Sequence, residues 1–223
     1  MTELRPAVSP TPRAQLAMDK LMDAAERLYA EHGFAGVSIR QISDAAGQRN
    51  KSVVQYHFSN RDELIKAIID RHIRPVDRYR MTQAAELVDK PEVSLRERVS
   101  CFVLPTVQHM IDLGTPSWYA RFTAQAFVEP SLREYAIRAH TESDSIQLLR
   151  ELPGWRANPS GELSTMIRQL VVHMGAELEY DLAHGRIPAS EAESSWRRLG
   201  DHLVTAVCGM SVAFMDNDQA ATG

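Results

Sequence analysis

Apolar residues recur along most of the chain at intervals of three and four, the spacing that gives an α-helix one buried face. This pattern predicts helices over residues 13–32, 76–89, 94–113, 116–128, 131–152, 161–184 and 189–215. Pro75 is expected to close or kink the helix that precedes residue 76, and Pro105 to kink the helix 94–113. No run has the alternating pattern of a half-buried strand. The sequence therefore predicts an all-α protein with about nine or ten helices.

Two short helices joined by a tight turn are predicted between residues 37 and 64. Ser38 and Gln41 have the spacing of a capping box, in which each side chain bonds the backbone of the other residue. Gly47 can supply the left-handed residue that ends this first helix. Asn50 can cap a second helix that reaches residue 55 or 56, and Asn60 can cap a longer one. This arrangement is a helix-turn-helix, whose second helix can enter the major groove of DNA.

The motifs of this segment resemble the DNA-binding domain of the tetracycline-repressor (TetR) family over residues 18–69. In order along the chain, they are Gly33-Phe34, Ser38-Ile39-Arg40-Gln41-Ile42, Ala46-Gly47, Tyr56-His57-Phe58 and Asn60-Arg61-Asp62-Glu63-Leu64. The stretch between Gly47 and Phe58 holds one residue more than the commonest family pattern. Aligned backwards from Phe58, the extra residue falls in the turn near Gln48 or Arg49, where it affects which side chains reach the bases.

The resemblance implies that Ser38, Tyr56 and His57 contact the phosphate backbone, a role that suits hydroxyl and imidazole groups. Base edges are then expected to be read from the first turns of the recognition helix, by Asn50, Lys51, Ser52 and Gln55. Arg40 and Arg49 are further candidates for backbone contacts. Four of these residues have a structural alternative, in which Ser38 and Asn50 serve only as helix caps and Tyr56 and His57 pack against the helix at 13–32.

Composition and charge support a two-part organisation. The chain has 223 residues, of which 44% are hydrophobic, enough for a sizeable core. The net charge of −4 is unevenly spread, with 13 basic and 10 acidic residues in 1–80, against 12 and 19 in 81–223. A mildly basic first third suits a DNA-contacting head on an acidic body. We predict a disordered arm at 1–12, the helix-turn-helix domain at 13–74, a ligand-binding and dimerisation domain at 75–215, and a disordered tail at 216–223.

The two cysteines and the hydropathy bear on location. Cys101 and Cys208 both lie in apolar helical patterns, which favours buried thiols over a disulfide and fits a reducing compartment. No apolar run reaches the roughly 18 residues that a membrane span needs, and the N-terminus lacks the apolar segment of a signal peptide. We therefore expect a soluble cytoplasmic protein, with no cofactor.

Two long amphipathic helices are predicted at the end of the chain. Such a pair can form a four-helix interface between two copies, and in the resembled family it makes the homodimer. The candidate interface residues are Leu170, Met174, Leu178, Trp196, Leu203, Val207 and Met210. The alternative is that both helices only close the core of a monomer. We favour a dimer, because two heads related by a twofold axis read a palindrome.

The resemblance also implies that the body binds a small effector that releases the protein, acting as a repressor, from its operator. The candidate pocket residues are Phe102, Met110, Trp118, Phe122, Phe127 and Met166. An apolar lining of this kind implies a hydrophobic effector. Aromatic residues and methionines at helical spacing are also ordinary core residues, which is the alternative for this set.

One polar strip could suggest a metal. His173, Glu177, Asp181 and His184 lie along one edge of the helix 161–184, and these residue types can bind zinc. Because no ligand motif of known spacing is present, we expect polar pairs at the rim of an interface, no metal site and no enzyme. Two alternatives to a DNA-binding regulator remain: a ligand-sensing or interaction dimer without operator binding, and a metal-dependent all-α enzyme.

Overall fold

The computed structural model describes residues 11–48, 53–152 and 161–221, with side chains up to Phe214. The predicted all-α class is confirmed, since these residues form helices and turns without a strand. The helices are α1 (Pro12–His32), α2 (Ile39–Ala45), α3 (Val53–Phe58), α4 (Arg61–Val88), α5 (Leu95–Leu113), α6 (Tyr119–Ala126), α7 (Arg133–Thr141), α8 (Asp144–Glu151), α9 (Gly161–Ala183), the 3-10 helix η1 (Ala189–Glu191) and α10 (Ala192–Ala221).

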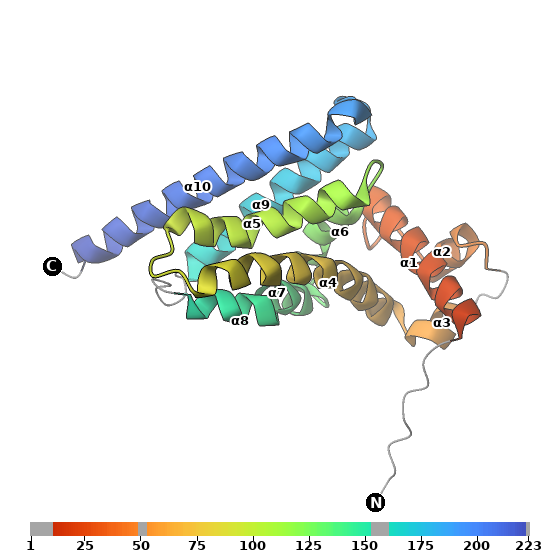
Figure 1. Ribbon diagram of the computed structural model, residues 1–223. Helices are drawn as coiled ribbons and strands as arrows, with labels where there is room; N and C mark the ends of the chain where they lie inside the picture. The colour runs from red at the N-terminus through yellow and green to blue at the C-terminus, as the bar shows by residue number, and fades with distance from the viewer. Residues whose placement is uncertain (1–10, 49–52, 153–160, 222–223) are drawn as a thin grey trace, which may run out of the picture.

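The helices form a small head and a larger body (Figure 1). The head consists of α1, α2 and α3, and α4 leads from it into the body. In the body, α4 packs against α5, α7 and α8, while α9 and α10 pack against each other and against α6 and α5 respectively. The C-terminal end of α10 extends past the other helices (Figure 1).

Local capping fixes the ends of α2 and the start of α4 as the sequence predicts, whereas α3 runs to Phe58 rather than ending at residue 55 or 56. The Ser38 hydroxyl accepts from the Gln41 backbone N–H at 3.3 Å, and the Gln41 side-chain oxygen accepts from the Ser38 N–H at 2.8 Å. This is the predicted capping box. Gly47, with φ of 67°, takes the left-handed conformation after α2. Asn60 caps α4 by accepting from the Glu63 N–H at 2.9 Å. The turn between Gly47 and the recognition helix includes residues 49–52, which lie outside the described residues.

Several helix boundaries in the body differ from the prediction. Pro75 does not close a helix, because α4 continues through it to Val88 and merges the two helices expected on either side. Likewise α5 is continuous across Pro105. The single helix expected over 131–152 is two helices, α7 and α8, separated at Glu142 and Ser143. The last helix runs to Ala221, beyond residue 215, where the apolar pattern ends.

One hydrophobic core extends from the head into the body. In the head and the first turns of α4, its fully buried members include Leu21, Ala25, Tyr29, Ile42, Leu64, Ile65 and Ile68. The same core continues through Phe122, Phe127 and Val103 of the body. A second, smaller cluster lies where α4, α5 and α8 meet, around Ala84, Cys101 and Leu149.

Aromatic packing joins the head to the body. The ring of Phe34, just after α1, contacts Tyr29 of α1 edge-on, with 4.8 Å between centroids, and Phe122 of α6 at 5.6 Å. The Gln125 side-chain N–H₂ on α6 donates to the Tyr29 carbonyl at 2.8 Å. The head is therefore fixed to α6 by core packing as well as by the chain connection through α4.

Candidate nucleic-acid interface

The second helix of the helix-turn-helix, α3, presents polar side chains outward. Val53, Val54 and Phe58 are buried, and α3 packs on α4 through this apolar face. Gln55 and Tyr56, on the opposite face, are exposed. Of the other predicted contacts, Arg49, Asn50, Lys51 and Ser52 lie outside the described residues. The described part of α3 therefore offers an amide and a phenol to a DNA groove.

Tyr56 does not pack on α1, the structural alternative considered for it. Its relative exposure is 83%, the highest among the exposed large hydrophobic residues of the described chain. Among the described residues, its ring contacts only that of its half-buried neighbour His57, at 4.9 Å between centroids. An exposed aromatic residue whose hydroxyl faces solvent is free to donate to a phosphate oxygen.

The N-terminus of α2 carries two more predicted contacts. Ser38 is exposed, so its hydroxyl both caps α2 and remains accessible. Arg40 is exposed and makes an ion pair with Asp44 at 3.7 Å, in which both side chains are more than 60% exposed. Exposed pairs of this kind contribute little to stability, so Arg40 can exchange Asp44 for a phosphate at small cost. The N-terminus of α2 also lies at the positive end of the helix dipole, which favours anions.

The structure places the predicted effector-pocket residues mostly in packed core. Phe122 and Phe127 are at most 2% exposed, and Met110 is 5% exposed. Trp118 is half-buried, with its indole N–H donating to Glu31 of α1 at 3.3 Å. Phe102 lies under the Arg80 guanidinium, and Met166 is exposed.

An open pocket of about 410 Å³ lies instead between α4 and α5. Its lining comes from one face of each helix and comprises Pro75, Arg78, Tyr79, Thr82, His109, Asp112 and Leu113. It therefore shares no residue with the set predicted from the sequence, and it is more polar than that set.

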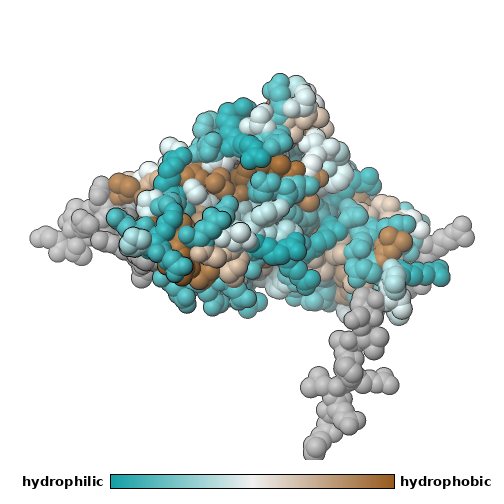
Figure 2. Space-filling model, in the orientation of Figure 1, coloured by the Kyte–Doolittle hydropathy of each residue, from teal (hydrophilic) through white to brown (hydrophobic). Residues whose placement is uncertain are grey.

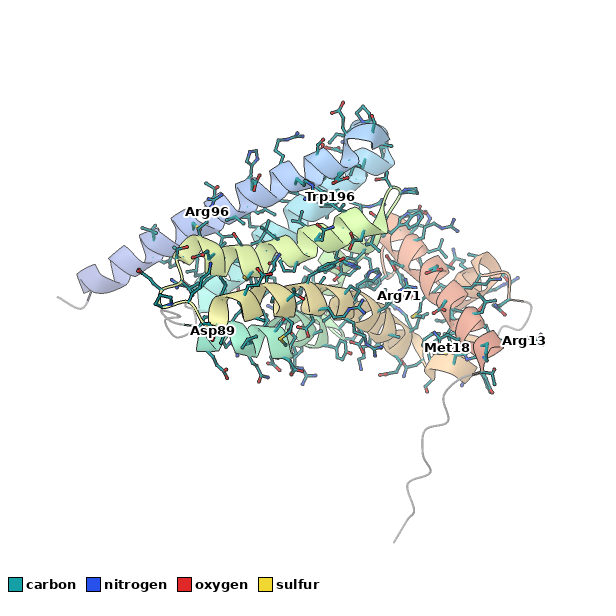
Figure 3. All side chains as sticks on the ribbon, in the orientation of Figure 1. Arg13, Met18, Arg71, Asp89, Arg96 and Trp196 are labelled. Atoms are coloured by element: carbon teal, nitrogen blue, oxygen red, sulfur yellow. The ribbon has the colours of Figure 1, made fainter. Side chains whose placement is uncertain are left out.

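The predicted dimer residues divide into two groups. Trp196, Leu203 and Val207 of α10 are at most 4% exposed in the single chain, where α10 packs on α5 (Figure 3 labels Trp196). They are buried within the single chain and therefore offer little apolar area to a partner. Met174 is 42% exposed, while Leu170, Leu178 and Met210 are half-buried.

Exposed apolar side chains remain on the last two helices. Met166, Met174 and Tyr180 on α9 and Val212 on α10 are each more than a third exposed. Figure 2 shows hydrophobic surface along the body where α10 lies over α5, whereas the surface of the head is mostly hydrophilic. An apolar face of this kind on a pair of long helices is suited to burial against another protein surface.

The polar strip on α9 is divided among separate local contacts. His173 and His184 each bond through Nδ1 to the carbonyl four residues earlier, and His184 also stacks on Tyr180. Asp181 pairs with Arg186 at 3.0 Å. Among the described residues, no group of three or more His, Cys, Asp or Glu side chains is placed to hold a metal ion.

A buried polar chain connects the head with two helices of the body. The Glu26 carboxylate on α1 accepts from His72 Nε2 on α4 at 2.8 Å, and His72 Nδ1 lies 2.9 Å from His109 Nε2 on α5. Arg71, labelled in Figure 3 where α4 meets the head, pairs with Glu26 at 2.5 Å. The ring of His72 stacks on Tyr119 of α6, with 4.0 Å between centroids. Glu26, His72 and His109 are all at most 6% exposed.

In this buried chain of hydrogen-bonded side chains, the local electrostatics keep Glu26 charged and His109 neutral. Burial alone would raise the pKa of Glu26, but the hydrogen bond and charge of His72, together with Arg71, lower it below its ordinary value. Burial, together with the neighbouring His72, lowers the pKa of His109 to about 4. At neutral pH, Glu26 is therefore a carboxylate and His109 a neutral imidazole.

The sequence analysis did not predict the buried contacts of Glu26, His72 and His109, although the sequence places Glu26 and His72 on apolar helix faces. Glu26 directly follows Ala24 and Ala25 on the buried face of α1, and His72 falls on the stripe that Ile68 and Ile69 mark in α4. A polar residue on an apolar stripe predicts a buried partner. The identity of the partner depends on the fold.

The remaining general expectations concern thiols and membranes. Cys101 is buried and Cys208 half-buried, and both are free thiols. None of the described helices has the length and hydropathy to span a membrane.

Comparison with known proteins agrees with the helix-turn-helix geometry. Residues 21–68 match the model of the family described as bacterial regulatory proteins, tetR family. An uncharacterized HTH-type transcriptional regulator of Mycobacterium tuberculosis is 34% identical over 80 residues, which cover 36% of this chain and 39% of that relative. The match therefore covers well under half the length of this relative.

The whole fold also resembles solved structures. A TetR family transcription regulator from Marinobacter aquaeolei superposes with a TM-score of 0.51 at 15% identity, covering 85% of this chain and 96% of that one. SmeT, the repressor of the Stenotrophomonas maltophilia multidrug efflux pump SmeDEF, superposes with a TM-score of 0.52 at 18% identity, covering 86% and 91%. At these identities the likeness concerns the fold, body included. Residues 21–68 therefore match the domain described for bacterial regulatory proteins of the tetR family, and the chain as a whole shares the fold of solved regulators of that family.

Proposed function

We propose that the protein is a homodimeric, sequence-specific DNA-binding repressor that a small effector releases from a palindromic operator. The observation that carries the proposal is the exposure of polar side chains on the helix-turn-helix, namely Gln55 and Tyr56 on α3 and Ser38 and Arg40 at the N-terminus of α2. Amide and guanidinium groups suit base edges and phosphates, and hydroxyls suit phosphates.

The roles divide between reading sequence and fixing register. Gln55 is exposed on α3 and can make two hydrogen bonds to adenine N6 and N7. Tyr56, His57, Ser38 and Arg40 are proposed to hold phosphates, which orients α3 without reading sequence. Arg49, Asn50, Lys51 and Ser52 remain proposed contacts from the sequence.

Dimerisation is proposed through α9 and α10. The exposed side chains Met166, Met174, Tyr180 and Val212 offer apolar area on these helices, and the half-buried Leu170, Leu178 and Met210 extend it. A single short recognition helix contacts few base pairs, so a twofold pair of heads is needed for a specific site. Replacing Met174 with Asp should shift the chain toward monomer in sedimentation velocity, while Val128→Asp, at an exposed apolar site after α6, should not.

The repressor role is supported by relatives and by the head-to-body contacts. SmeT, which shares the fold, is a repressor. The packing of Phe122 of α6 against Phe34, just after α1, gives the body a direct contact with the head. A ligand that favours one position of the body over another would thereby favour one position of the heads.

The test is selection of bound duplexes from a random pool, followed by anisotropy on the selected sites at several salt concentrations. We expect a palindrome whose half-sites lie about one helical turn apart. Replacing Gln55 with Ala should cost roughly 1–3 kcal/mol and relax specificity at one position of each half-site. Gln147→Ala, at an exposed glutamine on α8, is the matched control and should leave binding unchanged. Weak, steeply salt-dependent binding without a consensus would refute sequence-specific recognition.

A further inference from the structure

The pocket between α4 and α5 is built from groups that favour one kind of ligand. Arg78 is exposed and, within the described part of the chain, its guanidinium makes no hydrogen bond or ion pair. Pro75 and Leu113 contribute apolar surface. A volume of about 410 Å³ lies within the range of small-molecule sites. The free guanidinium can bind a carboxylate with two parallel hydrogen bonds.

A second charged group in the same pocket limits the ligand further. The Asp112 carboxylate accepts from the Tyr79 hydroxyl and from the Gln108 side-chain N–H₂, the latter at 2.8 Å. A carboxylate has four acceptor sites, so Asp112 can accept from another donor. Its negative charge disfavours a ligand with two anionic groups and favours one that also carries a hydrogen-bond donor. The pocket therefore fits a small organic monocarboxylate with a hydroxyl or ammonium group.

His109 connects this pocket with the buried polar chain. It lines the pocket, is 5% exposed, and its Nε2 lies 2.9 Å from His72 Nδ1. Since the Glu26 carboxylate can only accept, His72 Nε2 carries a proton. When His72 is neutral, its Nδ1 accepts from the Nε2–H of His109, and the Nδ1 of His109 is then an acceptor. Within the described residues this Nδ1 has no hydrogen-bond partner.

The same contacts make the head sensitive to the spacing of α4 and α5. If α5 moves away from α4, the His109–His72 bond breaks inside the protein, where unpaired polar groups are costly. His72 is held by Glu26 of α1 on its other side and stacks on Tyr119 of α6. A change at the pocket therefore acts on the helix that supports the helix-turn-helix.

We propose that this pocket is an effector site for a small carboxylate that carries a hydrogen-bond donor, and that its occupancy alters operator affinity through the His109–His72–Glu26 chain. The effect on operator affinity rests on the proposed DNA-binding function, whereas the binding of the carboxylate does not. By linkage, bound operator must change the affinity of the ligand by the same factor as the ligand changes that of the operator.

The ligand site is tested by calorimetry on the full chain without DNA. The probes are 3-phenyllactate, its neutral amide, and 3-phenylpropionate, which lacks the hydroxyl donor. We expect 3-phenyllactate to bind, and the other two to bind at least tenfold more weakly. Arg78→Gln should weaken 3-phenyllactate binding at least tenfold, while Arg74→Gln, which removes an exposed arginine from α4 outside the pocket lining, should leave it unchanged. Absence of binding at millimolar 3-phenyllactate, or equal loss in both arginine variants, would overturn the assignment.

The coupling is tested with the selected operator. Saturating 3-phenyllactate should change operator affinity at least tenfold in the unaltered protein. His72→Phe retains a ring against Tyr119 but removes both hydrogen bonds, so it should bind the probe within threefold of the unaltered protein and lose the effect on the operator. Glu26→Gln provides a second variant should His72→Phe fail to fold. If 3-phenyllactate still changes operator affinity in the folded variant, the coupling through the His109–His72–Glu26 chain is refuted. If the protein binds no operator, both the proposed function and the coupling through the His109–His72–Glu26 chain are refuted. The calorimetry without DNA still decides whether the pocket binds the ligand.

Discussion

Replacing Glu26 with Gln should destabilise the protein by about 2–3 kcal/mol. The carboxylate is 6% exposed and accepts from His72 Nε2 at 2.8 Å and from Arg71 at 2.5 Å. Breaking a buried ion pair typically costs about 3–5 kcal/mol. The lower value follows because Arg71 is 28% exposed and keeps its second partner, Asp23, at 2.6 Å. Gln can still accept from one donor, but its own N–H₂ group faces the other.

Urea denaturation at a single protein concentration measures this change, since dimerisation would make stability concentration-dependent. Glu134→Gln, at an exposed position of α7, is the control and should change stability by less than about 0.5 kcal/mol. A loss below about 1 kcal/mol for Glu26→Gln would refute the assignment of Glu26 as a charged group of the buried chain.

The same comparison has a predicted pH dependence. Because the pKa of Glu26 is lowered in the folded protein, its contribution to stability is complete well above its ordinary value of 4.5. It declines as the pH falls from there through the lowered folded pKa. The stability difference between the unaltered protein and Glu26→Gln should therefore be largest at neutral pH and shrink in acid. A difference that grows in acid would mean that the carboxyl is protonated when folded.

Three further changes have distinct expected signatures. Ser38→Ala removes the cap on the Gln41 N–H and should cost about 1 kcal/mol in urea denaturation, in addition to any loss of DNA affinity. Tyr56→Phe should leave the melting temperature unchanged, because the side chain is 83% exposed, but should weaken DNA binding evenly for all sequences in anisotropy. Phe122→Ala should cost about 3–5 kcal/mol by the same denaturation assay, because this fully buried ring packs against both Phe34 and Tyr29. Unchanged stability of Phe122→Ala would contradict a packed joint between head and body.

Local rules predicted the head well because its features are decided by neighbouring residues. The capping box of Ser38 and Gln41, the left-handed Gly47 and the Asn60 cap each involve residues at most three positions apart or a single backbone conformation. The body required tertiary information. At Pro75, a local penalty of about 3 kcal/mol argues for a break, yet packing of α4 on α5, α7 and α8 keeps the helix continuous.

The spacing of apolar residues in the sequence does not determine which surface buries them. Trp196, Leu203 and Val207 have the spacing expected of a dimer helix, but that spacing is the same whether the stripe faces α5 or another subunit. The α4–α5 pocket was unpredictable for a related reason. Its residues Arg78 and Asp112 are far apart in sequence and look like ordinary exposed charges until the two helices are placed side by side.

The joint between head and body has a consequence for protein engineering. Regulators are often redesigned by transplanting a DNA-binding head onto a foreign sensor, as if the two were separable modules. Here Phe34 of the head packs on Phe122 of α6, and Gln125 of α6 donates to the carbonyl of Tyr29 in α1. A hybrid that exchanged only residues up to the start of α4 would pair a foreign surface with these two α6 side chains. A functional hybrid should therefore carry α6 across with its own head, or retain Tyr29 and Phe34 in the incoming one.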